Sequence, residues 1–288
     1  MNYSALIQSR KTFHEFTDKK ASLASLKALR AYYRSNVRRL IPEIKTQLYL
    51  FGTDAQRALE GAAGYNQFLI GAPQYMILLS EKHAFAHLNA GYMMEDLILK
   101  LVDLGLDSTY LTFTDSDLVK SALNIDSPLD VVAIAAFGHG KKSVKRMQMN
   151  IRSMSDIDIT AKRQYMEPKH SIYELAFLGT WGNVHRLDEY IGFYDDMLWE
   201  ALYAVTLAPS YLNRQAYGFL LRDGSVSLIS RPDEYNTPID QALSLGIALH
   251  HFTAVAEERA ARLHWHFDQD ADSLNLPAGH QLIASSIL

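Results

Sequence analysis

Two adjacent cations near the start of the chain suit an anionic ligand. Arg10 and Lys11 stand side by side between the hydroxyl residues Ser9 and Thr12. Arginine offers a planar fork of donors and lysine a point charge, and both suit a phosphate. A solvated basic turn has the same composition, and this segment alone favours that interpretation.

A second basic segment follows a run of apolar residues. Gly138, Gly140, Lys141 and Lys142 come directly after the apolar residues 131–137. Glycines at the end of a strand allow close approach to the backbone, and the two lysines add positive charge. The spacing of a P-loop is absent. The segment is therefore a candidate phosphate contact, although taken alone it favours a plain basic turn.

A polar loop between an apolar helix and a strand is the third candidate. The segment 208–215 contains Pro209, Ser210 and Asn213. Hydroxyl and amide side chains at such a junction can bind the polar edge of a heterocycle. The alternative is a helix-terminating turn with local capping.

The fourth candidate is a stretch of backbone at the end of a long helical pattern. Leu106 and Asp107 follow Gly105, which is a typical C-terminal cap of a helix. As a functional segment, this backbone would lie against a flat ligand. As a structural one, it only ends the helix.

The elements that position these segments predict an α+β fold. Apolar spacing predicts a helix over 87–104, and short apolar runs predict strands covered on both faces. The pair Asp223-Gly224 predicts a tight hairpin. The remaining predicted elements are helices over 3–8, 197–207 and 239–261 and strands at 75–79, 110–113, 131–137, 217–221, 225–229 and 263–267.

The two halves of the chain have the pattern of an internal repeat. Placing Gly91 over Gly246, an offset of 155 residues, also places Leu97 over Phe252. The predicted helix and the strand after it keep one register in both halves. We therefore expect halves at 1–150 and 151–288, intertwined, with the charged stretch 141–163 as the crossover.

Composition excludes several classes of function. The 288 residues carry 28 Lys and Arg against 32 Asp and Glu, a net charge of −4, which disfavours nucleic acid as a partner. The absence of cysteine excludes disulfides and thiolate chemistry. His250 and His251 lack a metal-binding pattern and are expected to pack or lie at the surface, so no metal is predicted. Without a signal-peptide or membrane-spanning pattern, we expect a cytoplasmic protein.

In order and context, the four segments resemble motifs of the nitroreductase family of FMN-dependent oxidoreductases. Residues 9–11 resemble its Ser-Arg-Arg-Ser-like turn after an opening helix. Residues 209–215 resemble its Pro-Ser-x-x-Asn-x-Gln loop. Residues 105–108 resemble its Gly-Leu-Gly-Ser-like segment, with Asp107 in place of a small glycine. Residues 138–142 resemble its Gly-x-x-x-Lys/Arg phosphate contact.

The resemblance implies a single-chain pseudo-dimer. In ordinary members the Pro-Ser loop follows the arginine turn closely, and each flavin lies between two subunits. Here the two motifs are about 200 residues apart, in different halves. In the second half, Lys169 stands where an arginine turn would lie, and the first half carries Pro42-Glu43 where the Pro-Ser loop would lie. We therefore expect one flavin site per chain, in a monomer that can associate further.

The resemblance also implies the site and the activity. FMN would carry the chemistry, so no catalytic residue is assigned. NADH or NADPH would reduce it, and a nitroaromatic, quinone or similar small acceptor would reoxidise it by ping-pong exchange. The alternative is a flavin-binding or inactive protein of the same fold. The residues implied to bind FMN are Ser9, Arg10, Lys11, Asn66, Leu106, Asp107, Lys141, Lys142, Pro209, Ser210 and Asn213.

Overall fold

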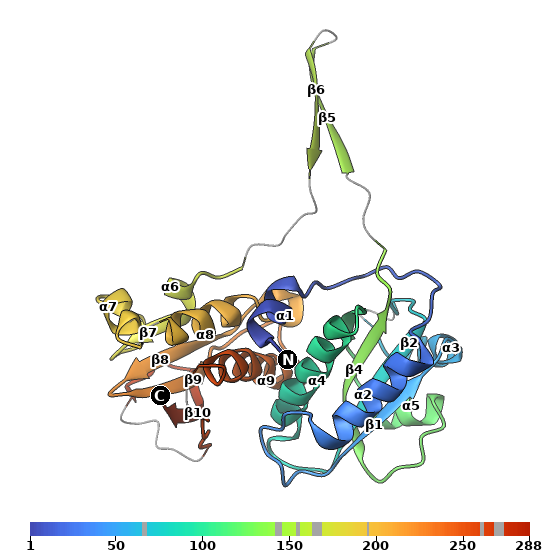
Figure 1. The fold of residues 1–288 in the computed structure, drawn as a ribbon, viewed down its shortest axis with the longest axis horizontal. Helices are drawn as coiled ribbons and strands as arrows, with labels where there is room; N and C mark the ends of the chain where they lie inside the picture. Colours follow the sequence, from blue (N-terminus) through green and yellow to red (C-terminus); the bar gives the residue numbers. More distant parts are fainter. Residues whose placement is uncertain are drawn as a thin grey trace.

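The chain folds into two antiparallel-rich sheets with helices between and around them. The computed structural model describes residues 1–64, 68–141, 146–153, 156–162, 169–194, 196–259, 262–267 and 274–288. The predicted α+β class is confirmed (Figure 1). The elements of the first part of the chain are α1 (Tyr3–Ser9), α2 (Leu23–Ser35), β1 (Thr46–Phe51), α3 (Asp54–Leu59), β2 (Gln74–Ser80), α4 (Ala86–Asp103), β3 (Asp107–Leu111), α5 (Ser116–Ala122) and β4 (Asp130–Gly138).

The second part repeats much of this order. Its hairpin is the one predicted from Asp223-Gly224, and both residues have a positive φ, 50° and 75°. The elements are β5 (Arg146–Ser153), β6 (Asp156–Lys162), α6 (Ile172–Leu175), β7 (Ala176–Leu178), α7 (Leu187–Gly192), α8 (Met197–Thr206), the 3-10 turn η1 (Tyr211–Asn213), β8 (Tyr217–Arg222), β9 (Ser225–Ser230), α9 (Pro238–Ala256) and β10 (Gln281–Ile287).

The two sheets share one strand order. The first sheet runs β1-β2-β4-β3, with every neighbouring pair antiparallel. In the second sheet β8, β9 and β10 repeat β1, β2 and β4, and a bridge from His266 to Ser285 places a segment beside β10 as β3 lies beside β4. The strand β7 is an addition, parallel to β8. The expectation of two similar halves is thereby confirmed.

The two long helices α4 and α9 pack against each other at the centre of the molecule (Figure 1). A Cβ on Gly91 would lie 2.2 Å from the Leu243 carbonyl oxygen, and one on Gly246 would lie 2.0 Å from that of Leu88. Leu243 precedes Gly246 by three residues, as Leu88 precedes Gly91. The contact is thus reciprocal, as at a two-fold interface, and it reproduces the predicted offset of 155 residues.

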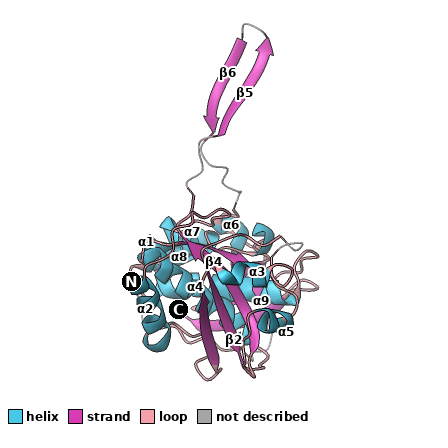
Figure 2. Cartoon of the chain, turned by 90° about the vertical axis from the view of Figure 1, so that its right-hand side faces the viewer, coloured by secondary structure: helices cyan, strands magenta, loops and turns pink. Residues whose placement is uncertain are grey.

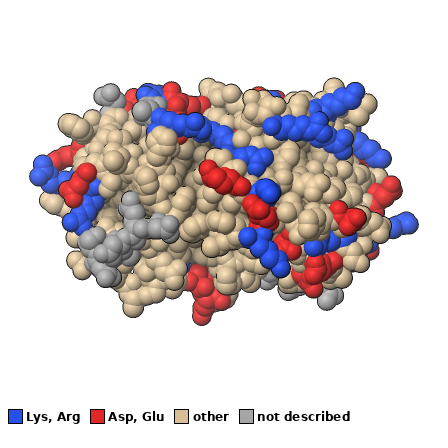
Figure 3. Space-filling model, turned by 90° about the horizontal axis from the view of Figure 1, so that it is seen from below, with Lys and Arg blue, Asp and Glu red and all other residues tan. Residues whose placement is uncertain are grey.

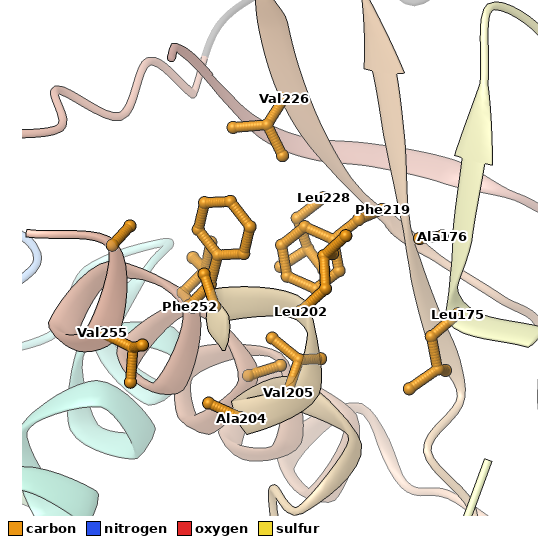
Figure 4. Packing of buried hydrophobic residues seen from close by; sticks show 14 of the residues in the cluster. Leu175, Ala176, Leu202, Ala204, Val205, Phe219, Val226, Leu228, Phe252 and Val255 are labelled. Atoms are coloured by element: carbon orange, nitrogen blue, oxygen red, sulfur yellow. The ribbon is translucent and has the colours of Figure 1, made fainter. Parts of the chain in front are cut away.

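Each half buries its own apolar core against these helices. In the second half, Phe219 of β8 stacks on Phe252 of α9 at 5.1 Å between ring centroids, and Leu202 and Val205 of α8 pack beside them (Figure 4). Leu97, the counterpart of Phe252, is fully buried in the first half. Apolar burial on this scale is the main stabilising contribution to the fold.

Some predicted boundaries differ from the structure. The strand expected at 110–113 is β3, which begins at Asp107 because its first residues pair with the end of β4. The helix expected to reach residue 261 ends at Ala256. The segment 263–267 forms only the bridge at His266.

The charged stretch expected as a crossover contains a separate two-stranded sheet. β5 and β6 pair antiparallel and stand clear of both larger sheets (Figure 2). The signal was the alternation of apolar and polar residues over 147–151 and 156–160, which favours strands. The expected boundary at residue 150 falls inside β5 and stays a prediction.

Candidate functional site

The arginine turn lies at the end of α1. Asn2 begins the helix by accepting a hydrogen bond from the Ala5 N–H at 2.9 Å, and Arg10 ends it in an extended conformation. Ser9 and Lys11 are exposed. The Arg10 side chain is only 6% exposed, so it points into the protein rather than into solvent.

The turn continues along the ends of two strands. A bridge joins Thr12 to Ser108 of β3, and another joins Phe16 to Gly140 after β4. The Lys141 N–H donates to the Glu15 carbonyl at 2.9 Å. Three of the four predicted segments, at 9–12, 105–108 and 138–141, are therefore brought together in the first half.

The glycines after β4 have a packing role. A Cβ on Gly138 would lie 2.5 Å from the Pro73 side chain, and one on Gly140 would lie 2.1 Å from the Phe13 ring. The Gly140 N–H donates to the Asp107 carboxylate at 2.9 Å. The space beside these two glycines is thus filled by the protein's own side chains and not left for a ligand. At this segment the lysines are therefore better candidates for a phosphate contact than the glycine backbone.

Several other predicted residues of the first half can be placed. Lys141 is exposed and Asp107 is half-buried. Leu106 is buried, and its N–H donates to the Leu101 carbonyl at 2.9 Å, which ends α4. The predicted residues Asn66 and Lys142 lie outside the described residues.

The polar loop of the second half is a constrained turn. The Gln215 N–H donates to the Ser210 hydroxyl at 2.9 Å, and the buried Gln215 amide donates to the Thr206 carbonyl at 3.0 Å. Leu212, Asn213 and Gln215 have φ values of 47°, 56° and 44°. Such left-handed conformations cost energy in residues other than glycine and cluster at functional sites.

A chain of buried polar contacts links Arg10 to the second half. Its Nε lies 3.2 Å from Oε1 of the fully buried Glu95 of α4. The same oxygen lies 3.0 Å from His251 Nε2 on α9, and His251 Nδ1 lies 2.8 Å from the Ala204 carbonyl of α8. Because α8 leads directly into the loop at 208–215, this chain spans both candidate regions.

The electrostatics of this chain centre on Glu95. Burial opposes ionisation of its carboxyl, yet Arg10 and His251 outweigh that cost and lower the pKa to about 2. Burial and the neighbouring Glu95 raise the pKa of Tyr110, whose hydroxyl donates to Glu95 Oε2 at 2.9 Å. At neutral pH the Glu95 carboxyl is therefore ionised.

Arg10 has unused donors. Its Nη1 donates to the Thr12 hydroxyl at 3.2 Å. Within the described part of the chain, the buried Nη2 has no hydrogen-bond partner, and the buried Nε has only its 3.2 Å ion-pair contact with Glu95. Buried donors without partners are rare and costly, so this guanidinium is suited to an anionic acceptor.

A second acid–histidine pair mirrors the first. His250 Nε2 lies 3.0 Å from Asp96 Oδ1, and both side chains are fully buried. At the offset of 155 residues, Glu95 corresponds to His250 and Asp96 to His251. The two pairs therefore cross the α4–α9 interface as reciprocal contacts.

Glu95 and Asp96 are not predicted as site residues from the sequence, nor is their pairing with His250 and His251. His250 and His251 are expected to pack or to lie at the surface, and the structure buries both, each paired with a carboxylate. The available signal was two adjacent acids inside an otherwise apolar helix, at the positions that match His250 and His251. Among the described residues, no group of three metal-ligating side chains could hold an ion, and none of the described helices has the length and hydropathy to cross a bilayer.

The fold of two similar halves is that of the nitroreductase class, and comparison with known proteins identifies the family. The family model described as "Putative TM nitroreductase" matches residues 2–179. The chain belongs to this family. No curated protein matches the chain.

One solved structure shares the fold along the whole chain, and others align with half of it. A "putative nitroreductase" from Thermotoga maritima aligns over 100% of this chain and 94% of its own, with a TM-score of 0.60 and 18% identity. A nitroreductase family protein from Clostridium difficile aligns over 50% of this chain and 87% of its own, with a TM-score of 0.42 and 17% identity. An FMN-dependent nitroreductase from the same species aligns over 50% and 90%, with a TM-score of 0.42 and 14% identity.

Proposed function

We propose that this protein is an FMN-dependent oxidoreductase that takes a hydride from NADH or NADPH and passes it to a small acceptor. Nitroaromatics and quinones are the acceptor classes that the nitroreductase resemblance implies. Membership of the family and the fold shared along the whole chain support an oxidoreductase. The chain would act as a monomer built as a pseudo-dimer.

The observation that carries the proposal is the state of Arg10. Its guanidinium is buried at the junction of α1, α4 and α9, and Nη2 has no hydrogen-bond partner among the described residues. A phosphate oxygen is an acceptor of the right charge for this donor. The exposed Lys11 and Lys141 flank the same turn and would add positive charge.

The residues present fit FMN, and each has a distinct task. Arg10, Lys11 and Lys141 would bind the phosphate. Pro209, Ser210 and Asn213 would contact the polar edge of the flavin from the second half, in a turn whose left-handed residues hold a fixed shape. Bound flavin would supply the hydride chemistry, and the protein would supply binding and orientation.

One site per chain is proposed. In the second half, Lys169 stands at the counterpart of the arginine turn, and its ammonium donates to the Ala208 carbonyl at 3.0 Å. In the first half, the counterpart of the Pro-Ser loop has Glu43 beside Pro42, which adds an acidic charge. The second site thus has a lysine bound to a backbone carbonyl where the first has Arg10, and it carries an acidic group that repels phosphate.

The overall charge of the chain favours a small-molecule substrate. Lysine and arginine side chains gather along the upper part of the face seen in Figure 3, and acidic side chains lie mostly in its middle and lower part. The net charge of the whole chain is −4. Because nucleic-acid binding is typical of chains with an excess of basic residues, the acidic balance supports a small acceptor.

The test is the flavin content of purified protein. The wild type should carry FMN and show its visible absorption, which should bleach on anaerobic addition of NADH or NADPH. Replacing Arg10→Ala should abolish retention, because losing a charge-assisted contact costs about 1.5–3 kcal/mol. Arg30→Ala, an exposed arginine on α2, is the matched control and should retain FMN.

Two results would contradict the proposal. Unchanged FMN content in a folded Arg10→Ala variant would remove the phosphate role. Flavin that stays oxidised under excess NADH and NADPH would favour a flavin-binding protein without turnover. The Asp107 carboxylate, bound to the Gly140 N–H beside the candidate site, is the feature that would favour that second function.

A further inference from the structure

The hydrogen bonds of His251 fix the number of protons in its pair with Glu95. A carbonyl oxygen only accepts, so His251 Nδ1 must donate to Ala204 O, 2.8 Å away. Nε2 then faces the Glu95 carboxyl oxygen at 3.0 Å. A neutral imidazole would point a lone pair at a carboxylate there. A proton must therefore lie on Nε2 or on the Glu95 oxygen.

The net charge of the pair follows from this count. If the proton is on His251, an imidazolium faces a carboxylate. If it is on Glu95, a neutral ring faces a carboxylic acid. In both cases the pair sums to zero. Glu95 is the one carboxylate within ion-pair distance of Arg10 in the described part of the chain, so the buried Arg10 keeps a full positive charge.

We propose that His251 sets the charge that Arg10 presents to an anionic ligand, by holding Glu95 in a neutral pair. His251 belongs to the second half and Arg10 to the first, so the contact makes the phosphate site depend on both halves. The proposal rests on the proposed function in one respect, that the ligand's anionic group is the phosphate of FMN. His251 touches no ligand and acts through Arg10.

The mirror pair of Asp96 and His250 needs no additional shared proton, so it supplies a matched control. The Asp96 carboxylate accepts from the Tyr3 and Tyr32 hydroxyls, each at 2.9 Å, and from the Arg38 N–H at 2.8 Å. His250 Nδ1 has no partner among the described residues, so a neutral ring with its proton on Nε2 satisfies Asp96. Arg10 forms no ion pair with Asp96.

The test compares the affinities of FMN and riboflavin, which differ only in the phosphate. Their ratio isolates the phosphate contribution, and it should exceed one in the wild type. In His251→Gln, Glu95 becomes the counter-ion of Arg10, and the ratio should fall about ten- to a hundredfold, the worth of one charge-assisted contact. In Glu95→Gln and in the double variant Glu95→Gln/His251→Gln, Arg10 keeps its charge, so the ratio should stay near that of the wild type.

The outcomes separate this proposal from the proposed function. A wild type that binds neither flavin, or binds both equally, removes the phosphate site and this proposal with it. A wild type that prefers FMN, together with an unchanged ratio in His251→Gln, overturns only the role of His251. Equal losses in Glu95→Gln and His251→Gln would indicate a structural role and also overturn it. His250→Gln should leave the ratio unchanged, and a loss equal to that of His251→Gln would count against the proposal.

Unmodified protein provides a check in case His251→Gln does not fold. Sulfate keeps its charge across the pH range, so its inhibition constant against FMN, corrected for the affinity of FMN at each pH, reports on the protein. The groups that face the pair are Arg10, Tyr110 and the neighbouring His250. As rising pH removes the shared proton, Glu95 becomes the counter-ion of Arg10 and sulfate should compete less well. Competition that is constant or grows with pH would overturn the proposal.

Discussion

Replacing Gly246→Ala tests the close contact between the two halves. A Cβ at this position would lie 2.0 Å from the Leu88 carbonyl oxygen of α4, and folded proteins essentially never show such contacts below 3.0 Å. The helices would have to separate by about 1 Å, because both clashing groups are held by helical backbone.

The magnitude follows from two opposing contributions. Overpacking of a well-packed interior costs about 1–3 kcal/mol, and contact with backbone favours the upper end. Alanine gains about 1 kcal/mol over glycine in helix propensity. We expect a net loss of about 2 kcal/mol in the free energy of unfolding. Adding Gly91→Ala should cost less than a second full loss, because both clashes are relieved by the same separation.

Urea unfolding followed by far-ultraviolet circular dichroism measures this change. Gly192→Ala is the matched control, since this glycine ends α7 and nothing lies within 4 Å of the added methyl group. It should be neutral or slightly stabilising. A Gly246→Ala variant as stable as Gly192→Ala would refute the reciprocal helix contact.

Two further predictions concern stability. The pKa of Glu95 is lowered from 4.5 to about 2, so its ionised form stabilises the fold above pH 4.5, and this contribution of about 3 kcal/mol is lost as the pH falls towards 2. In Glu95→Gln, the midpoint of urea unfolding should therefore fall less steeply with pH over that range. A slope equal to that of the wild type would contradict the ionised, buried Glu95. Leu212 is half exposed with a φ of 47°, so Leu212→Gly should stabilise the fold by about 1 kcal/mol through relief of left-handed strain. Leu118, which is similarly exposed, lies inside α5, so Leu118→Gly should destabilise the fold by about the same amount. Calorimetric melting temperatures that fall equally in both variants would contradict the strain at Leu212.

The long elements could be predicted because their patterns are local. The apolar spacing over 87–104 predicts α4 nearly to the residue, and Asp223-Gly224 predicts its hairpin because only a few residue pairs suit two positive φ values. The repeat could be found because Gly91 and Gly246 serve the same contact. Their shared register follows from the sequence alone, without knowledge of the contact.

The buried polar chain could not be predicted, because partners depend on tertiary packing. Glu95 and His251 are 156 residues apart, and nothing local indicates that they meet. Likewise, Gly138 and Gly140 predict the close approach of a ligand to the backbone, whereas Pro73 and Phe13 occupy that space. A glycine indicates that some group lies close to the backbone, but it does not indicate which group.

The amount of FMN released per chain from the purified protein tests the central proposal most directly. Denatured protein of known concentration, with the released flavin identified by chromatography, gives this ratio. The account predicts about one FMN per chain, because one half supplies the buried arginine and the other the polar loop. Two per chain would contradict the loss of the second site, and none after incubation with excess FMN would contradict the oxidoreductase itself.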